Sequence, residues 1–127
     1  MLLVLDTNAL IEVERNNAKV LQKLESLSRT YPGQLATTFL NVFECLVGFK
    51  NRYTDEGIKF LNNFVVLNTT KQTPFILAEL KTRYDTQGMS LPFIDMAIAA
   101  LVIENRAILI TTDKGFERIE ELQKIFI

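Results

Sequence analysis

The sequence predicts a single α/β domain with a central parallel sheet of four to five strands. Short apolar runs that favour strands alternate along the chain with segments that carry apolar residues at helical spacing. The strand runs are apolar at successive positions, which is typical of parallel strands covered by helices on both faces. A length of 127 residues suits one domain, spanning 1–127, and the chain shows no internal repeat or linker.

Apolar runs and capping residues indicate the first strand and the first two helices. The apolar run 2–5 predicts a buried strand. Thr7 and Asn8, either of which can cap a helix, come just before a helix that is expected to start near Ala9. The segment 18–29 predicts an amphipathic helix, because its apolar residues recur at helical spacing.

The middle of the chain continues this alternation. A Tyr-Pro-Gly turn at 31–33 precedes a second predicted strand at 34–38. The strongly apolar segment 39–49 predicts a helix, and residues 55–63 predict a shorter one. A third strand is expected at 64–67.

Proline and glycine mark the helices of the C-terminal half. Pro74 lies in the first turn of a helix predicted over 73–86, which stops at Gly88. Pro92 begins another predicted helix, which extends to about Asn105. The remaining expected elements are a strand at 108–111, a short helix at 116–122 and, if the sheet has five strands, a last strand at 124–127.

The composition restricts the chemistry that this chain can perform. It contains no histidine, which excludes a Ser-His-Asp triad, a Cys-His pair and imidazole acid–base catalysis. Its one cysteine, Cys45, excludes an internal disulfide, makes a zinc site unexpected and fits a reducing compartment. No apolar run is long enough to span a bilayer, and residues 1–5 lack the basic start of a secretion signal, so we expect a cytoplasmic protein.

Four acidic residues differ from the others because each is the lone charge on or beside an apolar element. Asp6 ends the first predicted strand, and Asp113 follows the fourth after two threonines. Glu44 is the only charged residue within 39–49, and Asp95 is alone in the apolar first part of its helix. An unpaired carboxylate is costly to desolvate, and no lysine or arginine lies on these elements. A shared cation is therefore the simplest partner.

The expected positions of these acids indicate one metal site at an edge of the sheet. Ligands of parallel α/β sheets bind beyond the carboxyl ends of the strands, where Asp6 and Asp113 are expected. Glu44 lies in a helix that follows a strand, and Asp95 lies in a first helical turn, where the helix dipole favours an anion. An all-oxygen cluster suits Mg²⁺ or Mn²⁺, which polarise a phosphodiester and activate water for in-line attack.

Taken one at a time, several of these residues allow simpler explanations. Asp6 could only cap the first helix, and Asp113 could only open the turn into the last one. Cys45 is more simply a small buried hydrophobic residue than a nucleophile, and Ser90, which has no visible activating base, is more simply a helix-start residue. The two acids expected to be buried within helices are harder to explain in this way.

Four motifs occur in order along the chain: Leu5-Asp6-Thr7-Asn8, Glu44, Asp95-Met96-Ala97-Ile98-Ala99-Ala100 and Thr111-Thr112-Asp113-Lys114-Gly115-Phe116. In this order and spacing they resemble the PIN-domain nucleases, most closely the VapC toxin branch, over essentially the whole chain. The resemblance implies a three-layer α/β/α fold and a magnesium- or manganese-dependent endoribonuclease. It also implies a VapB-like antitoxin partner, frequent homodimerisation, metal-site roles for Asp6, Glu44, Asp95 and Asp113, and supporting roles for Asn8 and Thr111.

The sequence departs from the family pattern at Gly115, where many relatives carry a further acid. With four acids instead of five, a second metal ion would bind weakly, or only when RNA phosphate supplies ligands. Apart from the four acids, the chain has 14 basic and 11 acidic residues, so the remaining surface is mildly positive. We expect RNA to contact a few basic residues near the site, with Lys50, Arg52 and Lys114 as candidates, although each could be an ordinary solvated charge.

The four acids favour an RNA-cleaving enzyme over two other classes of protein. A catalytically silent RNA-binding or assembly module derived from a nuclease would have little reason to keep four buried acids. A phosphatase or receiver-like phosphoacceptor domain would explain Asp6 but neither Glu44 nor Asp95. The segment 39–49 also has more apolar residues than one buried face needs, so we expect a homodimer that covers part of it, or part of the helix at 73–86.

Overall fold

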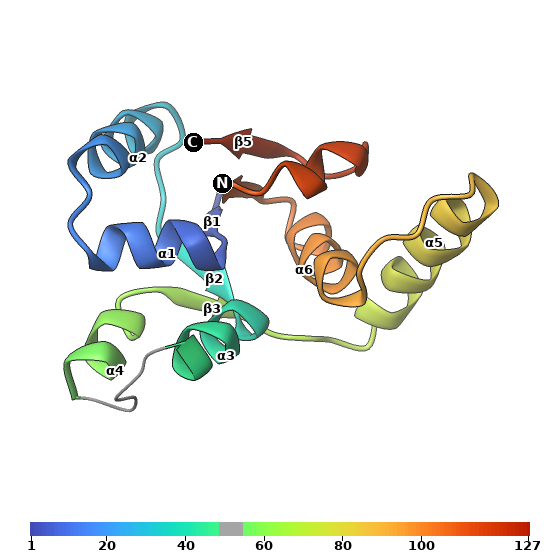
Figure 1. Cartoon of the computed structure of the whole chain (residues 1–127), viewed down its shortest axis with the longest axis horizontal. Helices are drawn as coiled ribbons and strands as arrows, with labels where there is room; N and C mark the ends of the chain where they lie inside the picture. Colours follow the sequence, from blue (N-terminus) through green and yellow to red (C-terminus); the bar gives the residue numbers. More distant parts are fainter. Residues whose placement is uncertain (49–54) are drawn as a thin grey trace.

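The computed structural model describes residues 1–48 and 55–127, and strands and helices alternate along them (Figure 1). In chain order the elements are β1 (Leu3–Leu5), α1 (Thr7–Glu14), α2 (Ala18–Thr30), β2 (Leu35–Thr38), α3 (Phe39–Gly48), α4 (Asp55–Leu61), β3 (Val65–Leu67), α5 (Thr73–Thr86), α6 (Phe93–Glu104), β4 (Ile108–Thr111), the 3₁₀-helix η1 (Lys114–Arg118) and β5 (Lys124–Phe126). The alternation that predicted the fold class is confirmed. No helix in these two ranges is both long and apolar enough to cross a membrane.

The strands form one sheet in the order β3-β2-β1-β4-β5, and each pairing is parallel. β1 lies at the centre, with Leu3 beside Leu35 of β2 on one side and beside Ile108 of β4 on the other. The carboxyl ends of β1 and β4 are therefore neighbours, and the backbone N–H of Asp6 donates to the carbonyl of Ile110 at 3.0 Å. This adjacency brings together residues that lie more than a hundred positions apart in the sequence.

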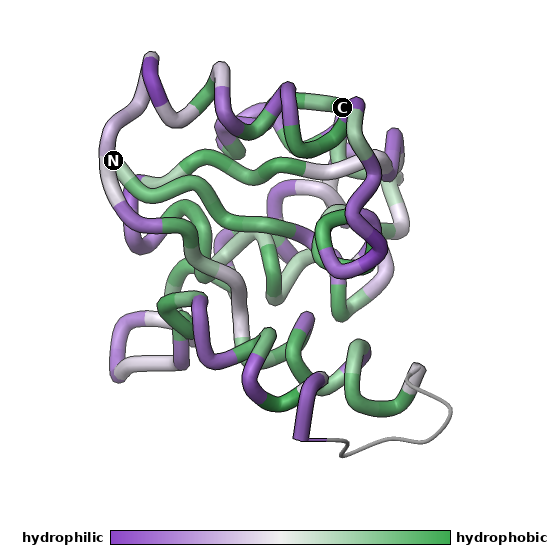
Figure 2. The backbone as a smooth tube through the Cα atoms, turned by 90° about the vertical axis from the view of Figure 1, so that its left-hand side faces the viewer, coloured by the Kyte–Doolittle hydropathy of each residue, from purple (hydrophilic) through white to green (hydrophobic). Residues whose placement is uncertain are grey.

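Helices cover both faces of the sheet and complete the expected three layers. Successive residues of β1 point into different cores, because side chains alternate between the faces of a strand. Val4 packs with residues of α5 and α6, whereas Leu3 and Leu5 pack with residues of α1 to α4. Figure 1 shows α5 and α6 on the side of the sheet away from α1 and α2. In Figure 2 the extended central segments are mostly hydrophobic, as a sheet buried on both faces requires.

The first helix begins earlier than expected. Asp6 is extended, and its carbonyl accepts the N–H of Leu10 at 2.9 Å, so Thr7 is already the first helical residue. The expected start near Ala9, capped by Thr7 or Asn8, is therefore wrong. The physical reason is that the Thr7 hydroxyl is engaged by a side chain of another element, Glu44, instead of capping its own helix.

The last helix also differs from the expectation of 116–122. A short 3₁₀-helix forms instead, over Lys114–Arg118. It starts earlier than expected, at Lys114, because the Asp113 side chain accepts the N–H of Gly115 at 2.8 Å. It ends early because Ile119 and Leu122 are buried in the core on the α5 and α6 side of the sheet, and the chain turns there to reach β5.

Candidate active site

The four acidic side chains singled out in the sequence lie at the carboxyl edge of the sheet. Asp6 directly follows β1, and Asp113 lies two residues after the end of β4 at Thr111. Glu44 lies in α3, which follows β2, and Asp95 lies in the first turn of α6, whose other end leads into β4. The charges of the other three acids all raise the pKa of Asp95, so the four share one electrostatic neighbourhood.

Asp6 is the buried member of this group, with 6% of its surface exposed. Its Oδ1 accepts a hydrogen bond from Nδ2 of Asn41 at 2.8 Å, and its Oδ2 accepts one from the hydroxyl of Thr111 at 2.7 Å. Asp6 occupies the N-cap position of α1, but its side chain makes no capping hydrogen bond. The explanation that Asp6 only caps the first helix is therefore wrong, because both carboxylate oxygens are held by side chains from other elements.

A chain of hydrogen bonds joins Asp6 to Glu44 through two neutral side chains. Nδ2 of Asn41 also donates to the hydroxyl oxygen of Thr7 at 3.0 Å. The Thr7 hydroxyl in turn donates to Oε1 of Glu44 at 2.7 Å. Asn41 and Glu44 are three residues apart on α3, so they lie on the same side of that helix, where the start of α1 meets it. Two carboxylates from different elements are thus connected without a charged partner.

Thr111 connects Asp113 to the same network. Its hydroxyl oxygen accepts the N–H of Asp113 at 3.0 Å while its proton is donated to Asp6. The Asp113 side chain is exposed, and its Oδ1 accepts the N–H of Gly115 at 2.8 Å. In this structure Asp113 therefore caps η1, which is the simpler explanation considered for this residue.

The site has negative charge that the described part of the protein does not neutralise by ion pairs. Burial raises the pKa of Asp6, against the opposing effect of the hydrogen bonds that it accepts, and the charge of Glu44 adds to the rise. Burial also raises the pKa of Asp95, followed by the charges of Asp113, Asp6 and Glu44, while Arg118 acts in the opposite direction. None of the ion pairs between described residues includes any of these four acids.

The burial expected for these acids is found only at Asp6. Glu44 and Asp95 are partly buried, and Asp113 is exposed. The reason is that the carboxyl edge of the sheet opens to solvent, so a side chain that projects there stays hydrated even when its element is apolar. Across residues 1–48 and 55–127, no three acidic or cysteine side chains are placed so that they could hold a metal ion as they stand.

Of the other polar and basic residues expected at the site, Asn8 and Lys114 lie at the surface. Asn8 is exposed, and its side chain makes no hydrogen bond to other described residues. Nζ of Lys114 lies 4.0 Å from the centroid of the Phe126 ring, a cation–π contact that leaves the lysine at the surface. Lys50 and Arg52 lie outside the described residues. Contact of these residues with RNA stays a prediction.

Cys45 and Ser90 have the environments expected of non-catalytic residues. Cys45 is 1% exposed. Its burial, followed by the charges of Glu44 and Asp6, raises the pKa of its thiol to about 11, so the thiol stays protonated. Ser90 is exposed, and the described residues provide it with no hydrogen-bonding partner.

Sequence reasoning missed Asn41, which is fully buried at the centre of this network. The hydroxyl of Thr38 donates to Oδ1 of Asn41 at 2.7 Å and accepts the backbone N–H of the same residue at 3.2 Å. A signal was available, because Asn41 lies three residues before Glu44 and therefore on the same side of an apolar helix, and an amide that is buried there needs hydrogen-bonding partners. A search restricted to charged side chains passes over it.

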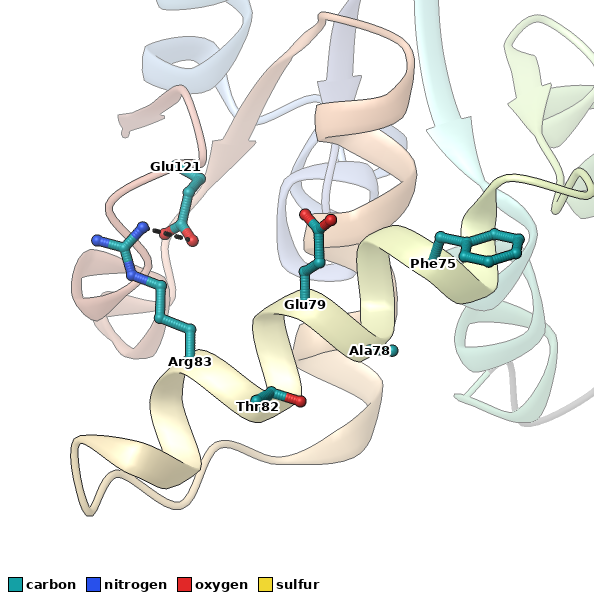
Figure 3. A pocket seen from close by; sticks show the side chains of 6 residues that line it. All are labelled: Phe75, Ala78, Glu79, Thr82, Arg83 and Glu121. Carbon is teal, nitrogen blue, oxygen red and sulfur yellow. Dashed lines mark hydrogen bonds and ion pairs between the residues drawn. The ribbon is translucent and has the colours of Figure 1, made fainter.

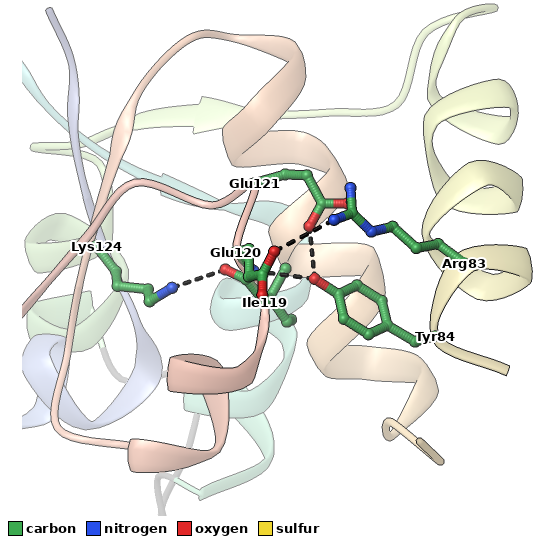
Figure 4. Close-up of polar contacts among 6 residues, drawn as sticks. All are labelled: Arg83, Tyr84, Ile119, Glu120, Glu121 and Lys124. Atoms are coloured by element: carbon green, nitrogen blue, oxygen red, sulfur yellow. Dashed lines mark hydrogen bonds and ion pairs between the residues drawn. The ribbon is translucent and has the colours of Figure 1, made fainter. Parts of the chain in front are cut away.

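A second polar cluster lies on α5 and contains none of the four acids (Figure 4). The Tyr84 hydroxyl donates to Oε1 of Glu121 at 2.5 Å and accepts the N–H of Glu120 at 2.9 Å, while Arg83 pairs with both glutamates. Beside it lies a surface hollow of about 650 Å³, which is lined by Phe75, Ala78, Glu79, Thr82, Arg83 and Glu121 (Figure 3). Arg83 and Glu121 already pair with each other, so the cluster has a structural role. Its contacts hold the segment between η1 and β5 against α5.

Solved structures of VapBC complexes share this fold over nearly the whole chain. The structure of VapBC2 from Rickettsia felis bound to a DNA fragment from their promoter matches with a TM-score of 0.85 and 21% identity, covering 100% of this chain and 99% of that one. VapBC-1 from nontypeable Haemophilus influenzae matches at 0.81 and 26% identity, covering 99% and 98%. DNA-bound VapBC from Salmonella typhimurium matches at 0.79 and 19% identity, covering 99% and 98%.

The sequence itself matches a family model. A search of curated proteins found no match to this chain. The model of the PIN domain, however, matches residues 3–122, which include β1, the four acids and the polar side chains that hold them. Because this match extends over most of the sequence, the chain belongs to the PIN domain family.

Proposed function

We propose that this protein is a metal-dependent endoribonuclease and the toxin of a VapBC-type toxin–antitoxin pair. The observation that carries the proposal is a group of four carboxylates that includes the buried Asp6 and shares one electrostatic neighbourhood. Asp6, Glu44 and Asp113 accept hydrogen bonds, and none of the four acids is neutralised by an ion pair in the described residues. PIN domains are generally nucleases, and the structural neighbours are VapBC complexes, which supports the toxin assignment.

The chemistry of the donor set fits Mg²⁺ or Mn²⁺, since the available ligand atoms are carboxylate oxygens. Asp6 would be the fixed ligand, because both of its oxygens are held and each retains a lone pair. Asp95 is partly exposed and Asp113 is exposed, so these two side chains have room to turn toward Asp6 when an ion binds, whereas Glu44 is already oriented by the Thr7 hydroxyl. When bound, the ion polarises the phosphodiester and activates water. With Gly115 in place of a further acid, we expect one tightly held ion.

The remaining chemistry belongs to residues that bind and orient. Asn41 and Thr111 hold Asp6, and Thr7 orients Glu44, so the ligands start from defined positions. RNA would reach the open edge of the sheet. Lys114 is adjacent to Asp113 there, and Lys50 and Arg52 follow α3 in the sequence. Phosphate contacts at so few basic residues predict weak binding without metal and a shallow dependence on salt.

Exposed apolar side chains support the proposed protein partners. Phe39, Phe43 and Val47 are spaced at four-residue intervals along α3 and are all exposed, as are Phe75 on α5 and Phe93 on α6. Large apolar residues grouped on helix faces mark surfaces that other chains cover. We propose that a second copy of this chain covers the stripe on α3 and that a VapB-like antitoxin covers apolar surface that the dimer leaves open.

Cleavage of a mixed RNA pool tests the proposed function. Wild-type protein should cleave with Mg²⁺ or Mn²⁺ and stop in EDTA, and Asp6→Asn and Asp95→Asn should abolish cleavage. Asp85→Asn is the matched control, because Asp85 is an exposed acid paired with Lys81 on α5, and it should keep full activity. Cleavage that survives Asp6→Asn would mean that the four acids are not the active site.

A second candidate is a catalytically silent RNA-binding or assembly module of the same family. It is favoured by one observation, namely that the described carboxylates are not already arranged around an ion. Such a module would bind RNA without cleaving it and would not change its melting temperature with Mn²⁺. The cleavage assay and a melt with and without Mn²⁺ separate the two candidates.

A further inference from the structure

We infer that Asn41 is a positioning residue that fixes two of the proposed metal-binding carboxylates, Asp6 and Glu44, at the same time. Because this role rests on the proposed function, it matters only if the acids bind an ion. Asn41 is fully buried on α3, and it makes hydrogen bonds with both atoms of its side-chain amide. Neither a capping role nor a packing role requires that arrangement.

The neighbours of Asn41 determine which way its amide faces. An ionised carboxylate only accepts hydrogen bonds, so Oδ1 of Asp6, at 2.8 Å, must face Nδ2 of Asn41. Oδ1 of Asn41 then faces Thr38, whose hydroxyl donates to it at 2.7 Å and accepts the Asn41 backbone N–H at 3.2 Å. Thr38 thus holds the amide from the opposite side, since a flipped amide would place its oxygen against the carboxylate and leave the Thr38 proton facing an N–H donor.

The second hydrogen of the same Nδ2 determines the direction of the Thr7 hydroxyl. Nδ2 donates to the Thr7 oxygen at 3.0 Å, so that oxygen is an acceptor on this side. Its single proton is then available for Oε1 of Glu44, at 2.7 Å. Without Asn41 the hydroxyl could rotate, and Glu44, which is only partly buried, would lose its defined orientation.

These contacts hold the carboxylates while leaving lone pairs for an ion. Groups that orient metal ligands by hydrogen bonds typically change metal affinity about 10- to 100-fold when removed. We expect Asn41→Ala, which releases both carboxylates, to weaken Mn²⁺ binding by about this factor. Thr7→Val keeps the contact between Asn41 and Asp6 and removes the hydroxyl that connects Asn41 to Glu44. It releases one carboxylate instead of two, so its loss of affinity should be smaller.

Titration calorimetry of EDTA-stripped protein with Mn²⁺ alone measures this directly, without RNA or turnover. The matched control is Asn105→Ala, because Nδ2 of Asn105 donates to the carbonyl of Leu101 at 2.7 Å, at the end of α6 away from Asp95. Thermal melts in EDTA report stability separately. A merely structural amide would lower the melting temperature in both Asn variants and leave Mn²⁺ affinity unchanged, whereas positioning lowers affinity only for Asn41→Ala and Thr7→Val.

The outcomes separate this role from the proposed function. Folded Asn41→Ala and Thr7→Val that bind Mn²⁺ within about twofold of wild type would overturn the positioning role and leave the metal site standing. If Asn41→Ala does not fold, Thr7→Val decides alone. Wild-type protein that binds no Mn²⁺ would overturn the metal site and this role together. A third outcome is that wild-type protein binds Mn²⁺ and the variants lose affinity in the predicted order, but no RNA is cleaved. This outcome would overturn only the proposed nuclease activity.

Discussion

Replacing Thr111 by valine tests whether Asp6 is held as a buried anion. Thr111 is fully buried, and valine keeps its branched shape without the hydroxyl. Two hydrogen bonds are lost, one donated to Oδ2 of Asp6 at 2.7 Å and one accepted from the N–H of Asp113 at 3.0 Å. The first bond ends on a charged group and the second on a neutral one.

The expected magnitude follows from these two contacts. A hydrogen bond to a charged group contributes about 1.5–3 kcal/mol and a neutral one about 0.5–1.5 kcal/mol. Thr111→Val should therefore lower the free energy of unfolding by about 2–4.5 kcal/mol in metal-free protein at neutral pH. For a domain of this size, about 4 °C per kcal/mol is expected, so the melting temperature should fall by about 8–18 °C.

The decisive assay repeats this substitution in the Asp6→Asn background, by urea unfolding in EDTA. The loss of the Asp113 contact is common to both backgrounds and cancels in the double-mutant cycle. What remains is the difference between a charged and a neutral partner at position 6, so Thr111→Val should cost about 1–1.5 kcal/mol less in that background. Equal costs within about 0.5 kcal/mol would refute the reasoning, because the charge of Asp6 would then not depend on Thr111.

Three further outcomes are expected. Burial raises the folded-state pKa of Asp6 above its ordinary 3.8, so the stability associated with this carboxyl is lost as pH rises through the folded pKa. Asp6→Asn should therefore melt above wild type in EDTA at neutral pH, with the difference vanishing below pH 3.8; a wild-type advantage at neutral pH would contradict this. Cys45, with a thiol pKa of about 11, should resist iodoacetamide in native protein and react in urea, and rapid native alkylation would show that the α3 face opens. Phe43→Glu should convert a homodimer to monomer in sedimentation; a wild-type monomer at micromolar concentration would rule out the dimer.

The fold could be predicted because its signals are local. β1, β3 and most of β4 are short apolar runs, and strands that are apolar on both faces favour a parallel arrangement. The last helix could not be placed from the sequence, because its start depends on the contact between the Asp113 side chain and the Gly115 backbone. Its end depends on the burial of Ile119 and Leu122, and apolar spacing alone does not distinguish this from a longer helix.

The candidate site was predicted in part for a similar reason. A lone acid on an apolar element is visible in the sequence, which identified the four carboxylates. The burial of these carboxylates could not be predicted from the sequence, because it depends on how far each side chain projects beyond the sheet edge. Asp113, for example, is exposed. Asn41 was hidden because it is neutral, and its importance appears only when β1, α1 and α3 are brought together.

The residue at position 115 determines how closely the Asp113 side chain can approach the start of η1. A Cβ added to Gly115 would lie 3.0 Å from Oδ1 of Asp113, the atom that accepts the Gly115 N–H. Any side chain there therefore requires this carboxylate to shift by a few tenths of an ångström, which strains its contact with the start of η1. With glycine at position 115, Asp113 caps η1 without this strain. With an acid at position 115, the cap is strained and a fifth carboxylate is added.

Gly115→Asp and Gly115→Ala distinguish the displacement from the added charge. Both should weaken the contact between Asp113 and the backbone of η1, so both should lose about 0.5–1.5 kcal/mol of stability in EDTA. Only Gly115→Asp supplies another ligand, so calorimetry without RNA should detect a second bound Mn²⁺ for this variant and one ion for Gly115→Ala and wild type. A second ion bound by Gly115→Ala would mean that freeing Asp113 is sufficient. A single ion bound by Gly115→Asp would mean that the missing acid does not limit metal binding, and that a second ion needs ligands from RNA phosphate.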